Sequence, residues 1–217
     1  MRDRMGREID YLRVSVTDRC NLRCRYCMPG GVPSVEHAEV LRYEELLRLC
    51  GLAAGLGIHA FKVTGGEPLV RRDCMSFLAE LKKLRGVEQV TLTTNGILLP
   101  DHLEALRTAG VDGINVSLDT LDDGLYSSLT GAPPGTAALV WRAAEASAAM
   151  GIHTKLNAVL LPETVEGIVE LTAAADTVPA DIRFIELMPI GAGKGRKGLP
   201  ASEALERLRT RWPDLEP

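Results

Sequence analysis

The sequence predicts an α/β fold in which six parallel strands alternate with helices and form a partial, open (β/α)6 barrel. Short β-branched runs alternate with apolar patterns of helical period along the chain, and such alternation implies parallel pairing through right-handed crossovers. A closed barrel of eight units takes about 250 residues, whereas this chain has 217. No linker-like composition divides residues 1–217, so we expect one domain.

The first strand is expected at 11–16, where apolar residues occupy alternate positions. A helix is expected at 43–56, with Leu46, Leu49 and Ala53 on its packed stripe and Gly57 placed to end it. The same reasoning places further strands at 60–64, 89–94, 113–117, 153–159 and 181–186. Their helices are expected from about residue 73, after Pro100-Asp101, and at 136–150, 165–175 and 200–211.

The loop after the first strand holds three cysteines within eight residues, at Cys20, Cys24 and Cys27. Three thiolates at this spacing can bind three of the four irons of a [4Fe-4S] cluster, which in electron-transfer proteins takes four cysteines. The remaining iron would then be open for chemistry. Zinc stays the alternative, because His37 could complete a tetrahedral set, although the two C-x2-C pairs of structural zinc sites are absent, since Cys24 and Cys27 form only one.

The rest of the composition indicates a reduced, cytoplasmic protein. Cys50 and Cys74 fall in expected helices and are interpreted as buried packing thiols. The start of the chain is charged, and no apolar run approaches the roughly 20 residues of a membrane span. The net charge of −4, without a long basic run, disfavours a nucleic-acid partner.

Polar and glycine-rich segments follow several of the expected strands: 65–68, 94–96 and 117–119. In parallel α/β sheets ligands bind at the carboxyl ends of the strands, so these segments and the cysteine loop are expected to line one site. The missing side chains of Gly65 and Gly66 would let the backbone approach a ligand closely. The basic run 191–198 lacks the order of a phosphate-binding loop and is interpreted as a mobile basic loop at the surface.

Strand alternation places three cations, Arg13, Lys62 and Lys155, on the faces opposite the helices. Burying cations is costly unless an anion shares the space, so together they favour an anionic ligand. The alternative is that each cation pairs with a nearby carboxylate, such as Glu67, Asp119 or Glu186, or extends to water.

With these residues in hand, the chain resembles the GTP 3′,8-cyclases, radical S-adenosylmethionine enzymes with a TIM-like partial barrel that act in molybdenum cofactor biosynthesis. The likeness rests on segments 10–20, 63–69, 92–96, 115–121, 155–157 and 183–189. It implies that Cys20, Cys24 and Cys27 hold the cluster. It also implies that S-adenosylmethionine contacts Tyr26, Gly66, Ser117 and Met188, and that GTP contacts Arg13, Lys62, Thr93 and Lys155. Many relatives have Arg at the position of Lys62, where Lys offers only a point charge.

The resemblance implies a lyase that cyclises GTP with an external electron donor. Whether the chain forms a homodimer is left open. No acid–base residue is assigned. The family has a second cluster, in a C-terminal region that also recognises guanine; this chain ends at Pro217, so we expect an N-terminal fragment. The alternatives are a short homologue with altered chemistry, a radical enzyme acting on a peptide or a tetrapyrrole, and a non-catalytic protein that binds the cluster and S-adenosylmethionine.

Overall fold

The structure is a computed structural model that describes residues 2–31 and 39–216 of the chain. His37, the fourth ligand in the zinc alternative, lies outside the described residues. The chain groups into two compact units, each described by itself below. The first consists of Met1–Asn21, Val32–Thr94 and Leu98–Asn115, and the second of Leu22–Gly31, Asn95–Ile97 and Val116–Pro217.

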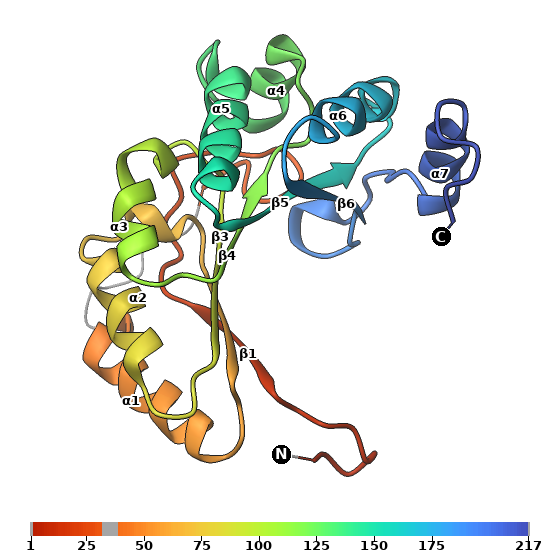
Figure 1. The fold of residues 1–217 in the computed structure, drawn as a ribbon. Coiled ribbons are helices and arrows are strands. Elements are labelled where there is room, and N and C mark those ends of the chain that lie inside the picture. The colour runs from red at the N-terminus through yellow and green to blue at the C-terminus, as the bar shows by residue number, and fades with distance from the viewer. Residues whose placement is uncertain (1, 32–38, 217) are drawn as a thin grey trace. The chain divides into compact units, whose positions relative to one another are not determined.

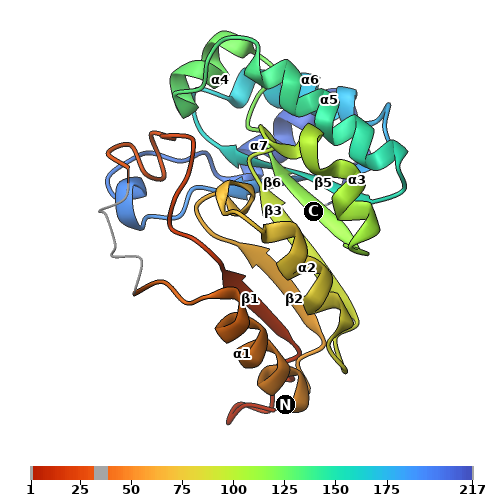
Figure 2. The same cartoon turned by 90° about the vertical axis from the view of Figure 1, so that its left-hand side faces the viewer.

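The first unit is built on three parallel strands, β1, β2 and β3, which pair in that order. Arg13 of β1 lies opposite Lys62 of β2, and Lys62 lies opposite Thr91 of β3. Figures 1 and 2 show α1 and α2 along one face of these strands. The elements are β1 (Tyr11–Ser15), α1 (Tyr43–Gly55), β2 (Ala60–Thr64), η2 (Pro68–Val70), α2 (Cys74–Lys83), β3 (Gln89–Thr94), η3 (Leu99–His102), α3 (Leu103–Thr108) and the start of β4 (Gly113–Ser117).

Side-chain alternation decides which face of the first unit is packed. Phe61, Val63 and Leu92 are fully buried, while the residues between them are partly exposed, as the alternation predicted. One helix position was predicted wrongly: Leu49 is 50% exposed. The buried stripe of α1 runs through Leu46 and Cys50 instead, because a helix of 3.6 residues per turn turns position 49 away from that line.

The second unit packs its helices on β5 and β6, which pair in parallel from Thr154 opposite Ala180 to Leu160 opposite Glu186. Figure 1 shows α5 and α6 along one side of these strands. Leu160, Ile168, Leu199 and Leu208 form a buried cluster that fixes α7 to this unit. The elements are α4 (Asp123–Thr130), α5 (Thr136–Ala149), β5 (His153–Leu160), η4 (Val165–Gly167), α6 (Ile168–Ala175), β6 (Ala180–Glu186), η5 (Gly191–Gly193) and α7 (Ala201–Arg209).

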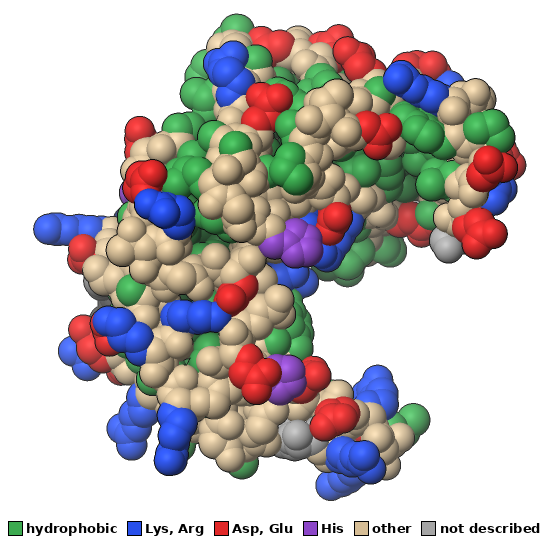
Figure 3. All heavy atoms as spheres, viewed as in Figure 1, with side chains coloured by type: hydrophobic (Ala, Val, Ile, Leu, Met, Phe, Trp, Pro, Cys, Tyr) green, Lys and Arg blue, Asp and Glu red, His purple; other side chains and the backbone are tan. Residues whose placement is uncertain are grey.

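The strands follow one another in the order β1-β2-β3-β4-β5-β6, each next to its neighbour in sequence. The predicted α/β fold with six strand–helix units is confirmed, and the expected strand bounds agree with the structure to within one residue. Within the described residues no helix combines the length and apolar character of a membrane span. On the face that Figure 3 shows, acidic and basic side chains are interspersed, in keeping with a net charge of −4.

Candidate functional site

Two of the three loop cysteines lie on a single tight turn of the second unit. The carbonyl of Cys24 accepts hydrogen bonds from the backbone N–H groups of Cys27 and Met28, both at 3.0 Å. The thiol-bearing residue Cys24 is half-buried and Cys27 is exposed. Cys20 belongs to the first unit and precedes Cys24 by four positions in sequence. No group of three or more His, Cys, Asp or Glu side chains is gathered to hold a metal among the residues that the structure describes.

The backbone before this turn is held by the C-terminal end of α4. The N–H of Arg23 donates to the carbonyl of Thr130 at 2.9 Å, and the N–H of Arg25 donates to the carbonyl of Leu129 at 2.8 Å. The guanidinium of Arg196 donates to the carbonyl of Arg25 at 3.1 Å. Arg196 lies in the basic run that sequence reasoning interpreted as a surface loop, so its contact with the cysteine turn was missed.

Tyr26, between the two cysteines, reaches the end of β4. Its hydroxyl donates to Asp119 Oδ2 at 2.5 Å, and the other carboxyl oxygen of Asp119 accepts from the N–H of Val159 at 2.8 Å. Burial raises the pKa of Asp119, and the hydrogen bonds from Tyr26 and Val159 oppose that rise. Burial, followed by the charge of Asp119, raises the pKa of the Tyr26 hydroxyl. Tyr26 therefore acts as a donor here.

The two glycines after β2 are needed for a close approach of backbone to backbone. A Cβ at Gly65 would lie 2.5 Å from the carbonyl oxygen of Thr17, and one at Gly66 would lie 2.3 Å from that of Arg19. The N–H of Gly66 donates to Thr17 O at 2.7 Å, and that of Glu67 to Arg19 O at 2.8 Å. The neighbour that a side chain at either glycine would meet is thus the segment leading to Cys20.

The three carboxylates named as partners for the interior cations are engaged elsewhere. Glu67, which is 0% exposed, accepts from the N–H of Leu69 and from the hydroxyl of Thr94. Glu186 accepts from the N–H of Ala201 at 2.6 Å, and Asp119 binds Tyr26 and Val159. These three carboxylates, which the alternative named as examples of partners for Arg13, Lys62 and Lys155, instead cap a backbone turn or join two segments.

Arg13 and Lys62 lie side by side on the strand face opposite α1 and α2. The ammonium of Lys62 lies 5.9 Å from the centre of the Tyr11 ring. Thr91 is in register with Lys62, and Thr93 follows two positions later on the same face. Among the described residues, no carboxylate lies within ion-pairing distance of Arg13 or Lys62. This face of the first unit is therefore suited to an anion.

In the second unit Lys155 has a counter-ion that sequence reasoning did not name. Its ammonium lies 3.1 Å from Asp181 Oδ2 on β6, and His153 Nε2 lies 3.0 Å from the same oxygen. The hydrogen bonds from His153 and then Lys155 lower the pKa of Asp181. Asp181 could have been found from the sequence only with the register of β5 against β6, which places it opposite Lys155.

The positions expected to contact S-adenosylmethionine are divided between the two units. Gly66 belongs to the first unit, and Tyr26, Ser117 and Met188 belong to the second. Ser117 ends β4, and the next residue, Leu118, donates its N–H to the carbonyl of Asn157 on β5. Met188 follows β6 and is 60% exposed.

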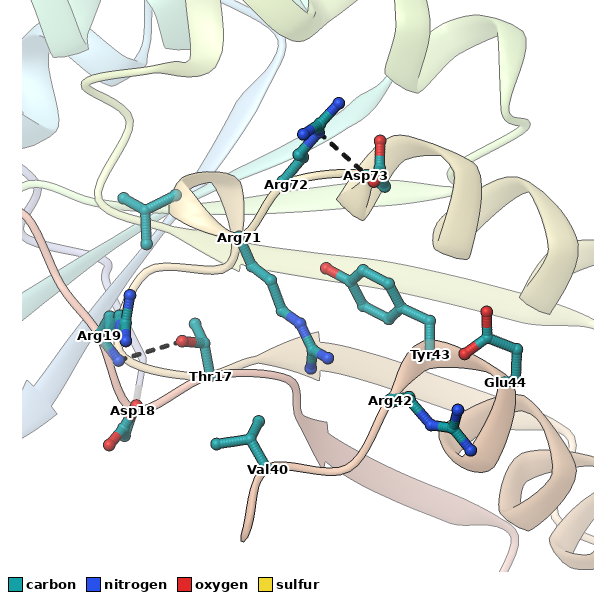
Figure 4. A pocket seen from close by; sticks show the side chains of 11 residues that line it. Thr17, Asp18, Arg19, Val40, Arg42, Tyr43, Glu44, Arg71, Arg72 and Asp73 are labelled. Carbon is teal, nitrogen blue, oxygen red and sulfur yellow. Dashed lines mark hydrogen bonds and ion pairs between the residues drawn. The ribbon is translucent and has the colours of Figure 1, made fainter. Parts of the chain in front are cut away.

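A cavity of about 470 Å³ in the first unit contains none of the expected cofactor or substrate residues. Figure 4 shows the guanidinium of Arg71 over the ring of Tyr43. Arg71 also donates to the carbonyls of Val16 and Leu41, and Arg72 pairs with Asp73 at 3.8 Å. Arg71 thus joins the end of β1 to the start of α1 and lines this cavity.

The remaining two cysteines are buried, as predicted. Burial raises the pKa of the Cys50 thiol to about 11 and that of the Cys74 thiol to about 11, so both stay protonated at neutral pH. Only Cys20, Cys24 and Cys27 are accessible as thiolate ligands.

Comparison with known proteins identifies the family. Residues 14–175 match the model of the Radical SAM superfamily. The chain is 48% identical over 202 residues to a GTP 3′,8-cyclase of Heliobacterium modesticaldum, covering 90% of this chain and 60% of that one. It is 44% identical over 222 residues to a GTP 3′,8-cyclase of Moorella thermoacetica, covering 100% of this chain and 68% of that one. The chain belongs to the GTP 3′,8-cyclase family of radical SAM enzymes.

The structural comparison agrees at the level of the fold. Streptococcus suis SuiB bound to S-adenosylmethionine superposes with a TM-score of 0.78 at 22% identity, over 94% of this chain and 47% of that one. The chain spans 60% to 68% of the length of these two cyclases. The family's cofactors are a [4Fe-4S] cluster and S-adenosylmethionine, and the donor set fits the cluster, since a thiolate turn without carboxylate or imidazole suits iron–sulfur chemistry.

Proposed function

We propose that this chain carries the radical-generating part of a GTP 3′,8-cyclase, whose product is a cyclised GTP used in molybdenum cofactor biosynthesis. The observation that carries the proposal is the three-cysteine motif, with Cys24 and Cys27 on one held turn, in a chain that is 44% to 48% identical to such cyclases. When bound by Cys20, Cys24 and Cys27, the reduced cluster would supply the electron for the reductive cleavage of S-adenosylmethionine, and the cleaved cofactor would supply the radical chemistry for GTP cyclisation.

The protein's part in this reaction is to bind, orient and exclude water. Cys20, Cys24 and Cys27 would hold three irons and leave the fourth for the methionine moiety of S-adenosylmethionine. Backbone and side-chain groups of Tyr26, Gly66, Ser117 and Met188 would hold the rest of that molecule. The amide of Gly66 already donates to Thr17 O, so its carbonyl is the group proposed to face the cofactor.

The substrate proposal rests on the cations of the strand faces. Arg13 and Lys62 stand in register without a carboxylate partner within the described part of the chain, and the triphosphate of GTP would supply the missing negative charge. Thr93, on the same face, would donate a hydroxyl. Lys155, from the second unit, would contribute if GTP displaces or shares its contact with Asp181.

The wider setting follows from the same assignment. A cluster that must be reduced needs an external electron donor. A chain with five cysteines, three of them proposed cluster ligands, suits the reducing cytoplasm. A homodimer remains part of the proposal without a defined interface.

The test is a paired measurement on the anaerobically reconstituted chain. With dithionite, S-adenosylmethionine and GTP present, 5′-deoxyadenosine and cyclised GTP are quantified from one reaction. We expect 5′-deoxyadenosine well in excess of cyclised GTP, because the relatives have additional length that this chain does not span, and lost positioning costs orders of magnitude in rate.

Two outcomes would contradict the proposal. A cluster-loaded chain that forms no 5′-deoxyadenosine would exclude the radical function, with the Cys24→Ala variant as the background. Near-equal amounts of 5′-deoxyadenosine and cyclised GTP would show instead that these 217 residues suffice for the complete cyclisation.

A further inference from the structure

The buried carboxyl of Asp119 bridges three segments of the second unit. Oδ1 accepts from the N–H of Val159 on β5, and Oδ2 accepts from the hydroxyl of Tyr26, 93 positions away in sequence. Asp119 itself lies two positions after Ser117, the end of β4. It is 4% exposed, and burying a carboxyl at this depth is costly unless its oxygens are satisfied.

Only one of these two contacts is explained by the packing of the strands. The hydrogen bond from Val159 joins the end of β4 to β5, and a neutral acceptor could provide it equally well. The contact from Tyr26 is different in kind, because it ties this strand end to the turn that carries Cys24 and Cys27. Its length of 2.5 Å is within the usual range for a hydroxyl donor and a carboxylate acceptor.

The other hydrogen bonds described for the cysteine turn involve the residues before Tyr26 or lie within the turn. The N–H groups of Arg23 and Arg25 are held by α4, and the carbonyl of Arg25 by Arg196. Within the turn itself, the hydrogen bonds from Cys27 and Met28 return to Cys24. Among the contacts described for the half of the turn after Arg25, the Tyr26 side chain provides the tie to β4.

We propose that Asp119 is a positioning residue, which through Tyr26 fixes the Cys24–Cys27 turn relative to the end of β4 at Ser117. The cluster-binding thiolates and the strand end proposed to hold S-adenosylmethionine are thereby held in one arrangement. The inference rests on the cluster and S-adenosylmethionine of the proposed function and is independent of the substrate.

The variants Asp119→Asn and Tyr26→Phe separate this role from simple folding stability. Val159 and Tyr26 donate to different oxygens of Asp119, and asparagine replaces one of these oxygens with an NH2 group, which cannot accept a hydrogen bond. Phenylalanine keeps the ring and removes the hydroxyl alone. Ser147→Ala is the matched control, because the Thr154 hydroxyl donates to Ser147 at 2.8 Å, both residues are fully buried in the same unit, and neither contacts the cysteine turn through any hydrogen bond that the structure describes.

Each variant is reconstituted anaerobically and its iron content, unfolding midpoint, S-adenosylmethionine affinity by equilibrium dialysis and reduced-cluster EPR spectrum are measured. Values are expressed per loaded cluster. We expect both variants to bind S-adenosylmethionine about tenfold more weakly, the size expected for loss of one hydrogen bond. The change in EPR spectrum that S-adenosylmethionine causes should also be altered. The double variant should bind S-adenosylmethionine no more weakly than the weaker-binding single variant. Ser147→Ala should lower only the unfolding midpoint.

A wild-type affinity and EPR response per loaded cluster in both Asp119→Asn and Tyr26→Phe would overturn the inference, whatever their stability. Additive losses in the double variant would also overturn it, because the two residues would then act separately. A wild-type chain that takes up no cluster would instead remove the proposed function and this inference together.

Discussion

Lys155 on β5 and Asp181 on β6 face each other, with the ammonium 3.1 Å from the carboxylate. Lys155 is thus a proposed phosphate ligand that already has a negative partner. Because Asp181 is 58% exposed at its side chain, their attraction is screened by water and is worth less than about 1 kcal/mol. An arriving triphosphate can therefore compete with Asp181 for Lys155.

Removing the cation Lys155 and removing the anion Asp181 should shift GTP affinity in opposite directions. Lys155→Met is expected to weaken GTP binding, since it removes a cation from the face, whereas Asp181→Asn is expected to strengthen it several-fold by removing the competing charge. Calorimetric titration of each variant with GTP gives both affinities. Lys155→Met should leave the free energy of unfolding within about 1 kcal/mol of wild type.

Lys82 supplies the control for this experiment. Its ammonium donates to Asp112 at 2.6 Å and to the carbonyl of Glu88 at 2.7 Å, away from the cationic strand faces. Lys82→Met should lower stability without changing GTP affinity. A Lys155→Met variant that loses several kcal/mol of stability would show that Lys155 serves the fold, as one half of a buried ion pair would.

The stability contributed by Asp181 should depend on pH in the acid range. Its pKa is lowered in the folded protein by His153 and Lys155, so the contribution is complete above its ordinary pKa of 3.8 and is lost as pH falls through the folded value. Urea unfolding of wild type and Asp181→Asn at pH 7, 5 and 3.5 measures the difference. A difference that grows between pH 5 and pH 3.5 would contradict the assignment.

Adding one methyl group at Gly66 should disturb the approach to the cysteine loop. The new Cβ would meet the backbone of Arg19 and Asp18 at 2.3 to 2.6 Å, and backbone cannot give way as a side chain can. Gly66→Ala is expected to lose about 1–3 kcal/mol of stability and to take up less iron on reconstitution.

Gly51 in α1 is the matched position, because a Cβ there would meet no atom within 4 Å. Gly51→Ala is therefore expected to raise stability by about 0.5–1 kcal/mol, through the lower entropy of the unfolded chain. Thermal unfolding and iron analysis of both variants decide the matter. Similar effects of the two substitutions would mean that the segment before Cys20 adjusts freely.

The three loop cysteines should be the only ones that determine iron content. The reconstituted chain is expected to hold about four irons, and Cys24→Ala to lose them. Cys50→Ala, which alters a buried thiol of high pKa, should retain them. Iron analysis and visible absorption measure the result, and a single tetrahedral zinc without visible absorption would support the zinc alternative.

The sequence by itself determined the fold class and predicted the chemistry of the cysteine loop. Both are local properties: the spacing of Cys20, Cys24 and Cys27 is written in eight consecutive residues, and strand alternation separates Lys62 from its buried neighbours Phe61 and Val63. Such patterns need no knowledge of distant contacts, which is also why the expected strand bounds agreed with the structure.

Only the tertiary structure decided the partners of the charged groups. Asp119 binds Tyr26 across 93 positions, and Lys155 finds Asp181 through the register of two strands. Glu67 was a sensible counter-ion by proximity in sequence, yet it caps η2 and accepts from Thr94. A carboxylate pairs with the donors that packing leaves nearest to it, and those distances follow from register and helix placement, which no local pattern encodes.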